Sequence, residues 1–234
     1  RAQKMVAVDG KKMTITPTFL SKEFFLWQAG DWASVWSPGQ EKLRGMARVV
    51  GVQGKTGNQT FHVTLESMPA GAAKGDIVLH EESLNRGSVI RNCSTSDIGT
   101  ENSSTRFRCV DVRFENNRFE DFHFWFHAGK NGPRPRDIVL KNNRVSDKRR
   151  GGIVFQQGLN CDLQDNQLNG VSLEFFKSEN MHLAGNRWTG MKTKQPHVIA
   201  RKGSTLQLTG DKQGSDPDSG KWIQHDNTSK VIRK

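Results

Sequence analysis

An asparagine-centred unit that recurs along the second half of the chain restricts the possible fold more than any other feature. In its complete copies, an apolar residue is followed three positions later by Asn, and a second apolar residue follows two positions after that Asn. The anchors of the series are spaced by 25, 26, 23, 20 and 25 residues: Asn92, Asn117, Asn143, Asn166, Asn186 and Asp211. A self-similar period of this length is typical of repeat architectures, in which each repeat packs on its neighbours.

The residues before each anchor indicate which kind of repeat this is. Apolar side chains stand five and three positions before the anchor, with a mostly polar residue between them, as in Val112 and Phe114 or Met181 and Leu183. This period of two predicts a short strand with one buried face in every copy. No copy is followed by a helical pattern, which argues against leucine-rich and ankyrin-like repeats.

We therefore predict an all-β chain whose main part is a right-handed parallel β-helix, with Asn side chains stacked along the axis and joined by hydrogen bonds. The alternative is an antiparallel sheet in which the Asn pairs only mark turns. The register that six copies share favours the β-helix. This solenoid is expected to span residues 86–213, and residues 214–234 are expected to form a C-terminal tail in which Trp222 and Ile223 cap the open end.

Residues 1–85 have a different sequence pattern and lack the Asn repeat. Six stretches have strand character at irregular spacing, namely 4–8, 12–16, 24–27, 47–52, 60–65 and 76–79. Turn signals rich in Gly, Pro and Asp separate them. They predict a small antiparallel β-barrel or sandwich, whose core would be filled in part by Trp27, Trp32 and Trp36.

Composition limits the classes of partner. The net charge of +11 could attract an acidic polymer, but Lys and Arg are scattered, with a single run at residues 148–150 and no nucleic-acid-binding motif. We expect a solvated basic surface and no nucleic-acid partner. Apolar runs stay well short of the roughly 18 residues of a membrane helix, so no membrane span is expected. A chain that starts at Arg1 without a signal-like segment is expected to be a portion of something longer.

The three cysteines do not form a metal-binding or redox motif. Cys93, Cys109 and Cys161 show neither a CxxC pair nor metal-ligand spacing. Cys161 falls on the inward phase of its strand, which predicts a buried thiol. A disulfide between Cys93 and Cys109 stays open, because sequence alone does not set their distance. We expect no metal and no cofactor.

The stretch 121–127 is the strongest candidate for a functional surface. Alternation places three Phe side chains on one side and four polar or amphipathic ones on the other: Asp121, His123, Trp125 and His127. The Phe side is expected to face the core. The other row would then lie on the outer wall, where a ligand or the N-terminal barrel could cover it. Aromatic rings stack on sugars, and His and Asp bind hydroxyl groups or move protons.

The same phasing extends this wall to the following coils. Gln156 and Glu174 would point outward, one on each of the next two coils. Glu174 is the best acid/base or hydroxyl-binding candidate, together with Asp121, although an ordinary solvated Glu is the alternative. Arg106 and Arg108 stand at the start of a coil and could bind a carboxylate or a sugar, or lie at a solvent-exposed edge.

The order of these elements resembles a known family. A barrel with an Ala-Gly-Asp turn at residues 29–31 precedes coils reading IRNC at 90–93, VRFENN at 112–117, WFHAG at 125–129 and PRDIVLKNN at 135–143. This resembles the C-terminal part of the parallel β-helix enzymes of glycoside hydrolase family 110, which are α-1,3-galactosidases. The resemblance covers most of the chain, and its motifs are mainly structural.

The chain departs from the pattern of this family in two respects. The paired catalytic aspartates of the family are expected in an element just before the barrel, upstream of Arg1, and His127 stands where the family is expected to have Glu. The resemblance implies a glycoside hydrolase that removes terminal α-galactose or a similar sugar from an oligosaccharide or polysaccharide, and a secreted or periplasmic location. The alternatives are a non-catalytic glycan-binding or adhesion β-helix and a polysaccharide lyase acting on an acidic polysaccharide. Whether the chain is itself an enzyme stays open at this point.

Overall fold

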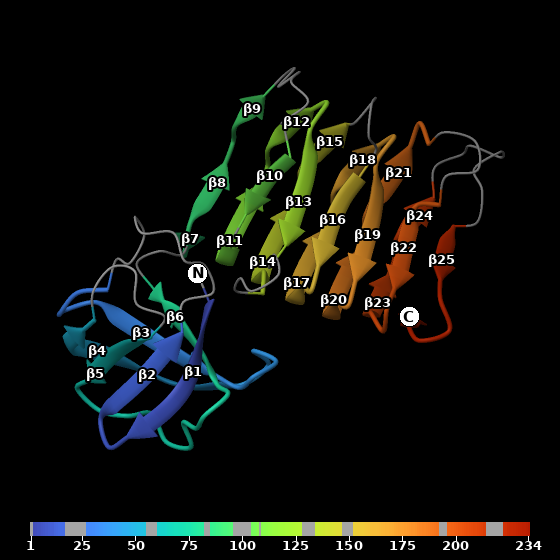
Figure 1. Cartoon of the computed structure of the whole chain (residues 1–234). Helices are drawn as coiled ribbons and strands as arrows, with labels where there is room; N and C mark the ends of the chain where they lie inside the picture. The colour runs from blue at the N-terminus through green and yellow to red at the C-terminus, as the bar shows by residue number, and fades with distance from the viewer. Residues whose placement is uncertain are drawn as a thin grey trace. The chain divides into compact units, whose positions relative to one another are not determined.

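The computed structural model describes residues 2–16, 27–54, 60–81, 85–95, 104–107, 109–127, 134–146, 152–191, 196–213 and 222–234. The chain divides into two compact units, one formed mainly by residues before 85 and the other mainly by residues from 85 onward. The sheets of each unit are shown in Figure 1. No helix within the described ranges is long and apolar enough to cross a membrane.

The N-terminal unit is a closed antiparallel barrel with the strand order β1-β2-β5-β4-β3-β6. Its strands are β1 (Ala2–Asp9), β2 (Lys12–Thr16), β3 (Trp32–Trp36), β4 (Leu43–Gln53), β5 (Phe61–Leu65) and β6 (Ile77–His80). The predicted small antiparallel barrel is therefore confirmed. The strand predicted over 24–27 lies outside the described residues except for Trp27, which is not part of a strand. β3 was not among the predicted strands.

The tryptophans of the barrel do not all fill its core as predicted. Trp27 and Trp36 are buried, whereas Trp32 is 38% exposed. Alternation along β3 turns the small residues Ala33 and Val35 inward, so Trp32 points out, where the Arg48 guanidinium lies 5.2 Å from its ring centroid.

The second unit is a β-solenoid with three parallel sheets, which we call faces A, B and C. Face A consists of β7 (Asn85–Arg86), β8 (Val89–Arg91), β11 (Cys109–Glu115), β14 (Arg136–Lys141), β17 (Leu159–Gln164), β20 (Glu179–Ala184), β23 (Thr205–Thr209) and β26 (Lys230–Arg233). Face B consists of β9 (Ser94–Thr95), β12 (Arg118–Glu120), β15 (Arg144–Ser146), β18 (Gln167–Asn169), β21 (Arg187–Thr189) and β24 (Lys212–Gln213). Face C consists of β10 (Ser104–Phe107), β13 (His123–His127), β16 (Gly152–Gln156), β19 (Ser172–Phe176), β22 (Val198–Arg201) and β25 (Ile223–His225).

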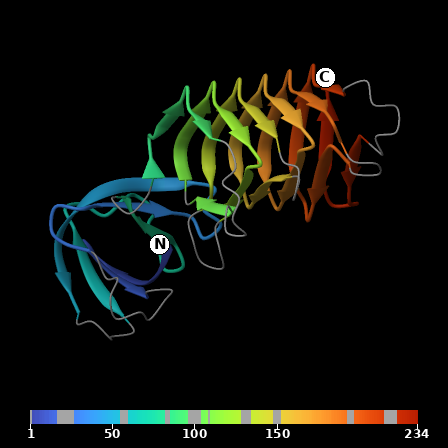
Figure 2. The same cartoon turned by 90° about the horizontal axis from the view of Figure 1, so that it is seen from above.

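Strands of successive coils lie side by side in chain order on every face, as Figure 2 shows from green to red. All pairings within the three faces are parallel; for example, Phe114 of β11 pairs with Leu140 of β14. The predicted parallel β-helix is confirmed. Residues 222–234 supply β25 and β26, so the solenoid extends beyond the predicted end at residue 213.

The core of the solenoid is apolar and contains a row of aromatic rings. On face C the inward rings of Phe126, Phe155 and Phe175 stack, with centroid distances of 4.7 and 5.7 Å between neighbours. Cys161 lies fully buried among apolar side chains, as predicted, and burial raises the pKa of its thiol to about 12. Such stacking places one large ring per coil and keeps the strand spacing uniform along the axis.

The Asn ladder runs along the corner between faces A and B. The amide oxygen of Asn143 accepts hydrogen bonds from the backbone N and the Nδ2 of Asn117, both at 3.0 Å. Its own Nδ2 donates to the carbonyl of Phe114 at 2.8 Å and to Asn166 Oδ1 at 3.1 Å. The pattern repeats through Asn186 to Asp211. The predicted axial stack of amides is confirmed.

The first anchor of the series was misassigned by one residue. Cys93, not Asn92, occupies the ladder position of its coil, because the backbone N of Cys93 donates to Asn117 Oδ1. Asn92 is exposed and occupies the preceding position, where the backbone has a positive φ in every coil. That column is Asn92, Asn116, Asn142, Asp165, Gly185 and Gly210. Asn is favoured both at left-handed positions and in amide ladders, so a single Asn could not be assigned to one column from sequence.

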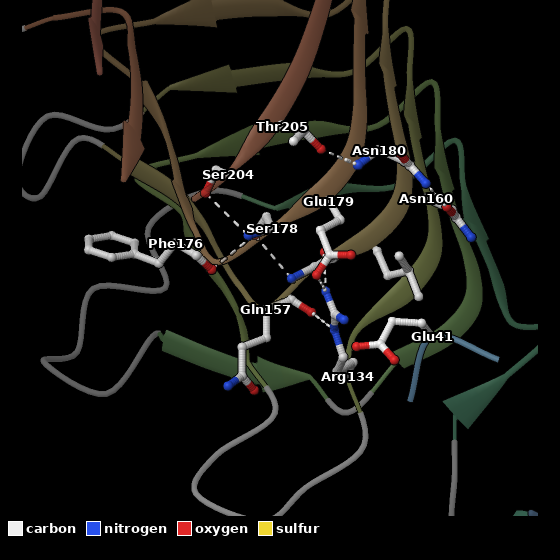
Figure 3. Close-up of polar contacts among 12 residues, drawn as sticks. Glu41, Arg134, Gln157, Asn160, Phe176, Ser178, Glu179, Asn180, Ser204 and Thr205 are labelled. Atoms are coloured by element: carbon white, nitrogen blue, oxygen red, sulfur yellow. Dashed lines mark hydrogen bonds and ion pairs between the residues drawn. The ribbon is translucent and has the colours of Figure 1, made fainter. Parts of the chain in front are cut away.

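A second ladder, built from serines, runs along the corner between faces C and A. Ser178 Oγ accepts a hydrogen bond from Gly158 N at 3.1 Å, and Ser204 Oγ accepts one from Ser178 N at 3.2 Å. Ser229 continues the series by accepting from Ser204 N. Figure 3 shows Ser178 and Ser204 in line along this corner. These hydroxyl groups satisfy backbone donors that the turn would otherwise leave buried without a partner.

Candidate functional site

The outer wall of face C carries two columns of side chains, set by the register of its strands. The first column contains Trp125, Val154, Glu174, Ile199 and Gln224. The second contains His127, Gln156, Phe176 and Arg201. Successive members of a column are about 4.8 Å apart. Four sequence-predicted residues are thus brought together on one wall: Trp125, His127, Gln156 and Glu174.

Aromatic rings form the surface of this wall. Trp125 and His127 lie with ring centroids 4.8 Å apart and ring planes inclined by 31°. Two coils on, the Arg201 guanidinium lies 5.8 Å from the Phe176 ring centroid. Both pairs are half-buried or exposed rather than part of the core. The wall therefore offers flat, partly apolar surfaces flanked by hydrogen-bonding groups, which is the combination that sugar rings need.

Glu174 stands in an apolar part of its column. Its neighbours on the adjacent strands are Val154 and Ile199, and the carboxylate itself is half-buried. Among the outward side chains that the structure describes on β13, β16, β19, β22 and β25, Glu174 is the one carboxylate. It can accept hydrogen bonds from sugar hydroxyls or take part in proton transfer.

His123 points outward two residues before Trp125, so it lies beside the first column and outside both. It falls in register with Gly152 and Ser172, both buried. A Cβ added at Gly152 would lie 3.7 Å from His123 Cε1, an ordinary van der Waals contact, so the imidazole lies directly beside this glycine. His123 thus belongs to the edge of the wall, next to the corner between faces B and C.

Asp121 does not lie on the wall. It occupies the corner before β13 with a φ of 53°, in register with Gly170 and Gly190, which also have positive φ. Asp121 is therefore a turn residue, and the alternation used to phase it begins only at His123. Along the strand direction it is offset by four residues, about 13 Å, from the column of Glu174. The structure does not bring Asp121 and Glu174 together as a pair.

Of the two predicted arginines, Arg106 and Arg108, the structure describes only the backbone of Arg106. The backbone of Arg106 pairs with Trp125, which assigns position 106 to the first column. The side chain of Arg106 is not described, and Arg108 lies outside the described residues. Their predicted roles stay predictions.

Two residues of the wall were missed by the sequence reasoning. Phe176 and Arg201 belong to the column of His127 and Gln156. Phe176 stands two residues after Glu174, so the same alternation also phases it outward. Arg201 lies on a coil whose register cannot be counted from the preceding one, because the spacing between coils varies. The strand pattern 198–201 could have placed it.

A buried ion pair was also missed, near the serine ladder (Figure 3). The Arg134 guanidinium donates to Glu179 Oε1 at 2.9 Å and to the carbonyl of Gln157 at 2.9 Å. Its side chain is 7% exposed, whereas that of Glu179 is 42% exposed. Because Arg134 joins carbonyls of the turn at Gln157 to a strand two coils away, we interpret it as a structural clamp of the corner between faces C and A.

The described residues contain no group of three or more His, Cys, Asp or Glu side chains that could hold a metal ion. Cys93 and Cys161 are free thiols.

No protein-family model matches the sequence, and no curated protein matches it. Among solved structures, the chain is similar to a candidate glycosyl hydrolase from Parabacteroides merdae, at 8% identity over 65% of this chain and 82% of that chain, with a TM-score of 0.46. It is also similar to QnrB1, a plasmid-mediated fluoroquinolone resistance protein, at 12% identity over 61% of this chain and 85% of that chain, with a TM-score of 0.25. Likenesses this distant transfer no activity to this chain.

Proposed function

We propose that face C binds a carbohydrate and that the chain is part of a glycoside hydrolase acting on a terminal α-galactose or a similar sugar. The observation that carries the proposal is the wall itself, where the rings of Trp125 and His127 lie 4.8 Å apart in the same two columns as Glu174 and Gln156. Aromatic rings cover the apolar face of a sugar, while amide and carboxylate groups bind its hydroxyls.

Each side chain has a distinct role in this proposal. Trp125 and His127 stack on the sugar ring, and Gln156 both donates to and accepts from hydroxyls. Glu174 accepts hydrogen bonds from sugar hydroxyls, and it stands in register between the apolar residues Val154 and Ile199. His123 lines the edge of the site beside Gly152.

Hydrolysis of a glycosidic bond normally needs two carboxyl groups, roughly 5 to 9.5 Å apart depending on the stereochemical course. The described outward side chains of face C supply one, Glu174. The resemblance to glycoside hydrolase family 110 implies catalytic aspartates upstream of Arg1, and the proposal adopts this implication. In the proposal, face C therefore binds the sugar, and a carboxylate pair on an upstream segment cleaves it. A secreted or periplasmic location belongs to the same proposal.

The test is sugar release from a panel of α- and β-linked glycans, measured for this chain and for a chain extended upstream. We expect release by the extended chain, and a drop of about tenfold or more in kcat/KM for Trp125→Ala because it loses the stacking platform. Glu174→Gln is compared with Glu115→Gln, a half-buried outward Glu on face A. If Glu174→Gln and Glu115→Gln changed kcat/KM for sugar release by the same factor, a role of face C would be contradicted.

One observation favours a second candidate, a glycan-binding module without activity. A single described carboxylate on the wall suits binding better than cleavage. Retained sugar binding without release by either chain would support this candidate. A lyase would instead yield unsaturated products and lose activity with a chelator, which the same assay detects.

A further inference from the structure

Face B carries a second, chemically different surface. Its outward side chains fall into two columns, one with Arg118, Arg144, Gln167 and Arg187, the other with Glu120, Ser146, Asn169 and Thr189. A hollow of about 300 Å³ lies over these strands, lined by every residue of both columns except Arg187. The surface belongs to the solenoid alone, and all the strands that form it are described.

The charge of this surface is positive and only partly compensated. Glu120 binds Arg118, with its Oε1 at 2.7 Å from Nε and 2.5 Å from a terminal guanidinium nitrogen. Arg144 and Arg187 are exposed, and neither forms an ion pair with a carboxylate of the described residues. Two guanidinium groups therefore remain available to an anionic ligand, with neutral hydroxyl and amide groups beside them.

We propose that face B is a binding surface for an extended polysaccharide that carries one carboxylate on each uronic acid residue. Arg recognises carboxylates in a bidentate manner, and the column of Ser146, Asn169 and Thr189 supplies partners for sugar hydroxyls. The columns repeat at about 4.8 Å per coil, which is close to the length of one sugar ring in an extended glycan. The proposal rests on face B and does not depend on the function proposed for face C.

Two features favour a uronate polymer over other polyanions. The outward positions of β12, β15, β18 and β21 hold no aromatic side chain, whereas surfaces for single-stranded nucleic acid combine basic groups with stacking platforms. Gln167 interrupts the arginine column, and Glu120 adds a negative charge. This low charge density suits one carboxylate per sugar better than clustered sulfate groups or phosphates.

The proposal is tested with polygalacturonate as the probe, by calorimetry or affinity electrophoresis at low and moderate salt. We expect the double variant Arg144→Gln/Arg187→Gln to lose roughly tenfold or more in affinity, because it removes two charge-assisted contacts. The matched control is Arg113→Gln/Arg233→Gln, which removes the same charge from exposed positions of face A and should retain binding. Gln167→Arg completes the column and should tighten binding, a gain that a folding defect does not imitate.

Three outcomes would overturn the proposal. The first is failure of the unaltered chain to bind polygalacturonate at low salt. The second is an equal loss in the face A control, which would assign binding to overall charge. The third is an equal response of heparin or of single-stranded oligothymidine to the face B variants, which would make face B a general polyanion surface. Sugar release by Trp125→Ala on neutral glycans is measured separately, so the proposal for face C can fail without affecting this result.

Discussion

The two ladders of the solenoid both supply hydrogen-bond partners to buried backbone groups at a corner, but one uses amides and the other hydroxyl groups. At the corner between faces A and B, the side chain of Asn143 takes part in four hydrogen bonds that join it to both neighbouring coils. At the corner between faces C and A, the hydroxyl of Ser178 accepts from Gly158 N and has one proton to donate, with the carbonyls of Phe155 and Phe176 in reach. An amide thus crosslinks coils through side chains, whereas a hydroxyl mainly satisfies backbone groups.

This difference predicts that removing an amide of the Asn ladder lowers the free energy of unfolding more than removing a hydroxyl of the serine ladder. Removing an amide leaves several buried donors and acceptors on two coils without partners, whereas removing a hydroxyl leaves fewer. In a solenoid each coil contacts only its neighbours, so a local defect weakens one interface rather than the whole core.

The largest effect is expected for Asn143→Ala. It leaves the amide of Asn117 and the carbonyl of Phe114 without their partner, so the free energy of unfolding should fall by about 3 kcal/mol or more. Urea denaturation measures the change. Asn169→Ala, at an exposed position of face B without a positive φ, is the control for the loss of an Asn. If Asn143→Ala lowered the free energy of unfolding by less than the control variant, the ladder would contribute little to stability.

A smaller effect is expected for Ser178→Ala. The backbone N of Gly158 loses its acceptor, and the free energy of unfolding should fall by about 1–2 kcal/mol. The same denaturation experiment applies, with Ser172→Ala, a buried serine of face C, as the comparison. A loss as large as that of Asn143→Ala would remove the proposed distinction between the corners.

A gain in stability is expected where the Asn ladder ends in an acid. Asp211 Oδ1 accepts from the backbone N and Nδ2 of Asn186, but its buried Oδ2 has no hydrogen-bond partner among the described residues. Burial raises the pKa of Asp211, while the hydrogen bonds from Asn186, the backbone of Thr209 and the charge of His182 act in the opposite direction. Asp211→Asn restores a donor in place of Oδ2 and should stabilise the fold by about 1 kcal/mol at pH 7.

The sign of the pH dependence follows from that shift. A carboxyl whose pKa is higher in the folded chain contributes stability below its unfolded pKa and loses it as the pH rises through the folded pKa. The advantage of Asp211→Asn should therefore grow from acidic to neutral pH. Unfolding free energies measured across this range check it, with the exposed Asp165→Asn as control. A variant that is less stable than the parent at neutral pH would show that the ionised carboxylate is the stabilising form.

The fold was largely predictable because its strongest determinant is local. Each Asn of the ladder sits at a fixed offset from two inward residues, so both the strand and the corner can be recognised in the sequence. The serine ladder was missed, although Ser178, Ser204 and Ser229 also recur at the period of the coils. Its first position is Gly158, and serine is common in loops for many reasons, so the signal is weak without the register.

The candidate site was predictable only along single strands. The alternation within residues 123–127 placed Trp125 and His127 correctly on the outer wall. Which residues stand beside them depends on the lengths of the corners, which vary between coils. Asp121 was assigned to the wrong part of the coil because the alternation of β13 was extended into the corner before it. The arginine column of face B was not recognised, although Arg118, Arg144 and Arg187 each directly follow an Asn of the ladder.

The Asn ladder also gives the solenoid an electrical direction. Each amide oxygen accepts from the preceding coil, and each ladder backbone N donates to the following one. Each Nδ2 donates once in each direction, to the next amide oxygen and to a carbonyl of the preceding coil. The amide dipoles therefore add along the axis, with their positive end at Asn186, where the chain places Asp211. Two such solenoids can extend this pattern only head to tail, because two ends of the same kind would face each other with donors opposite donors or acceptors opposite acceptors.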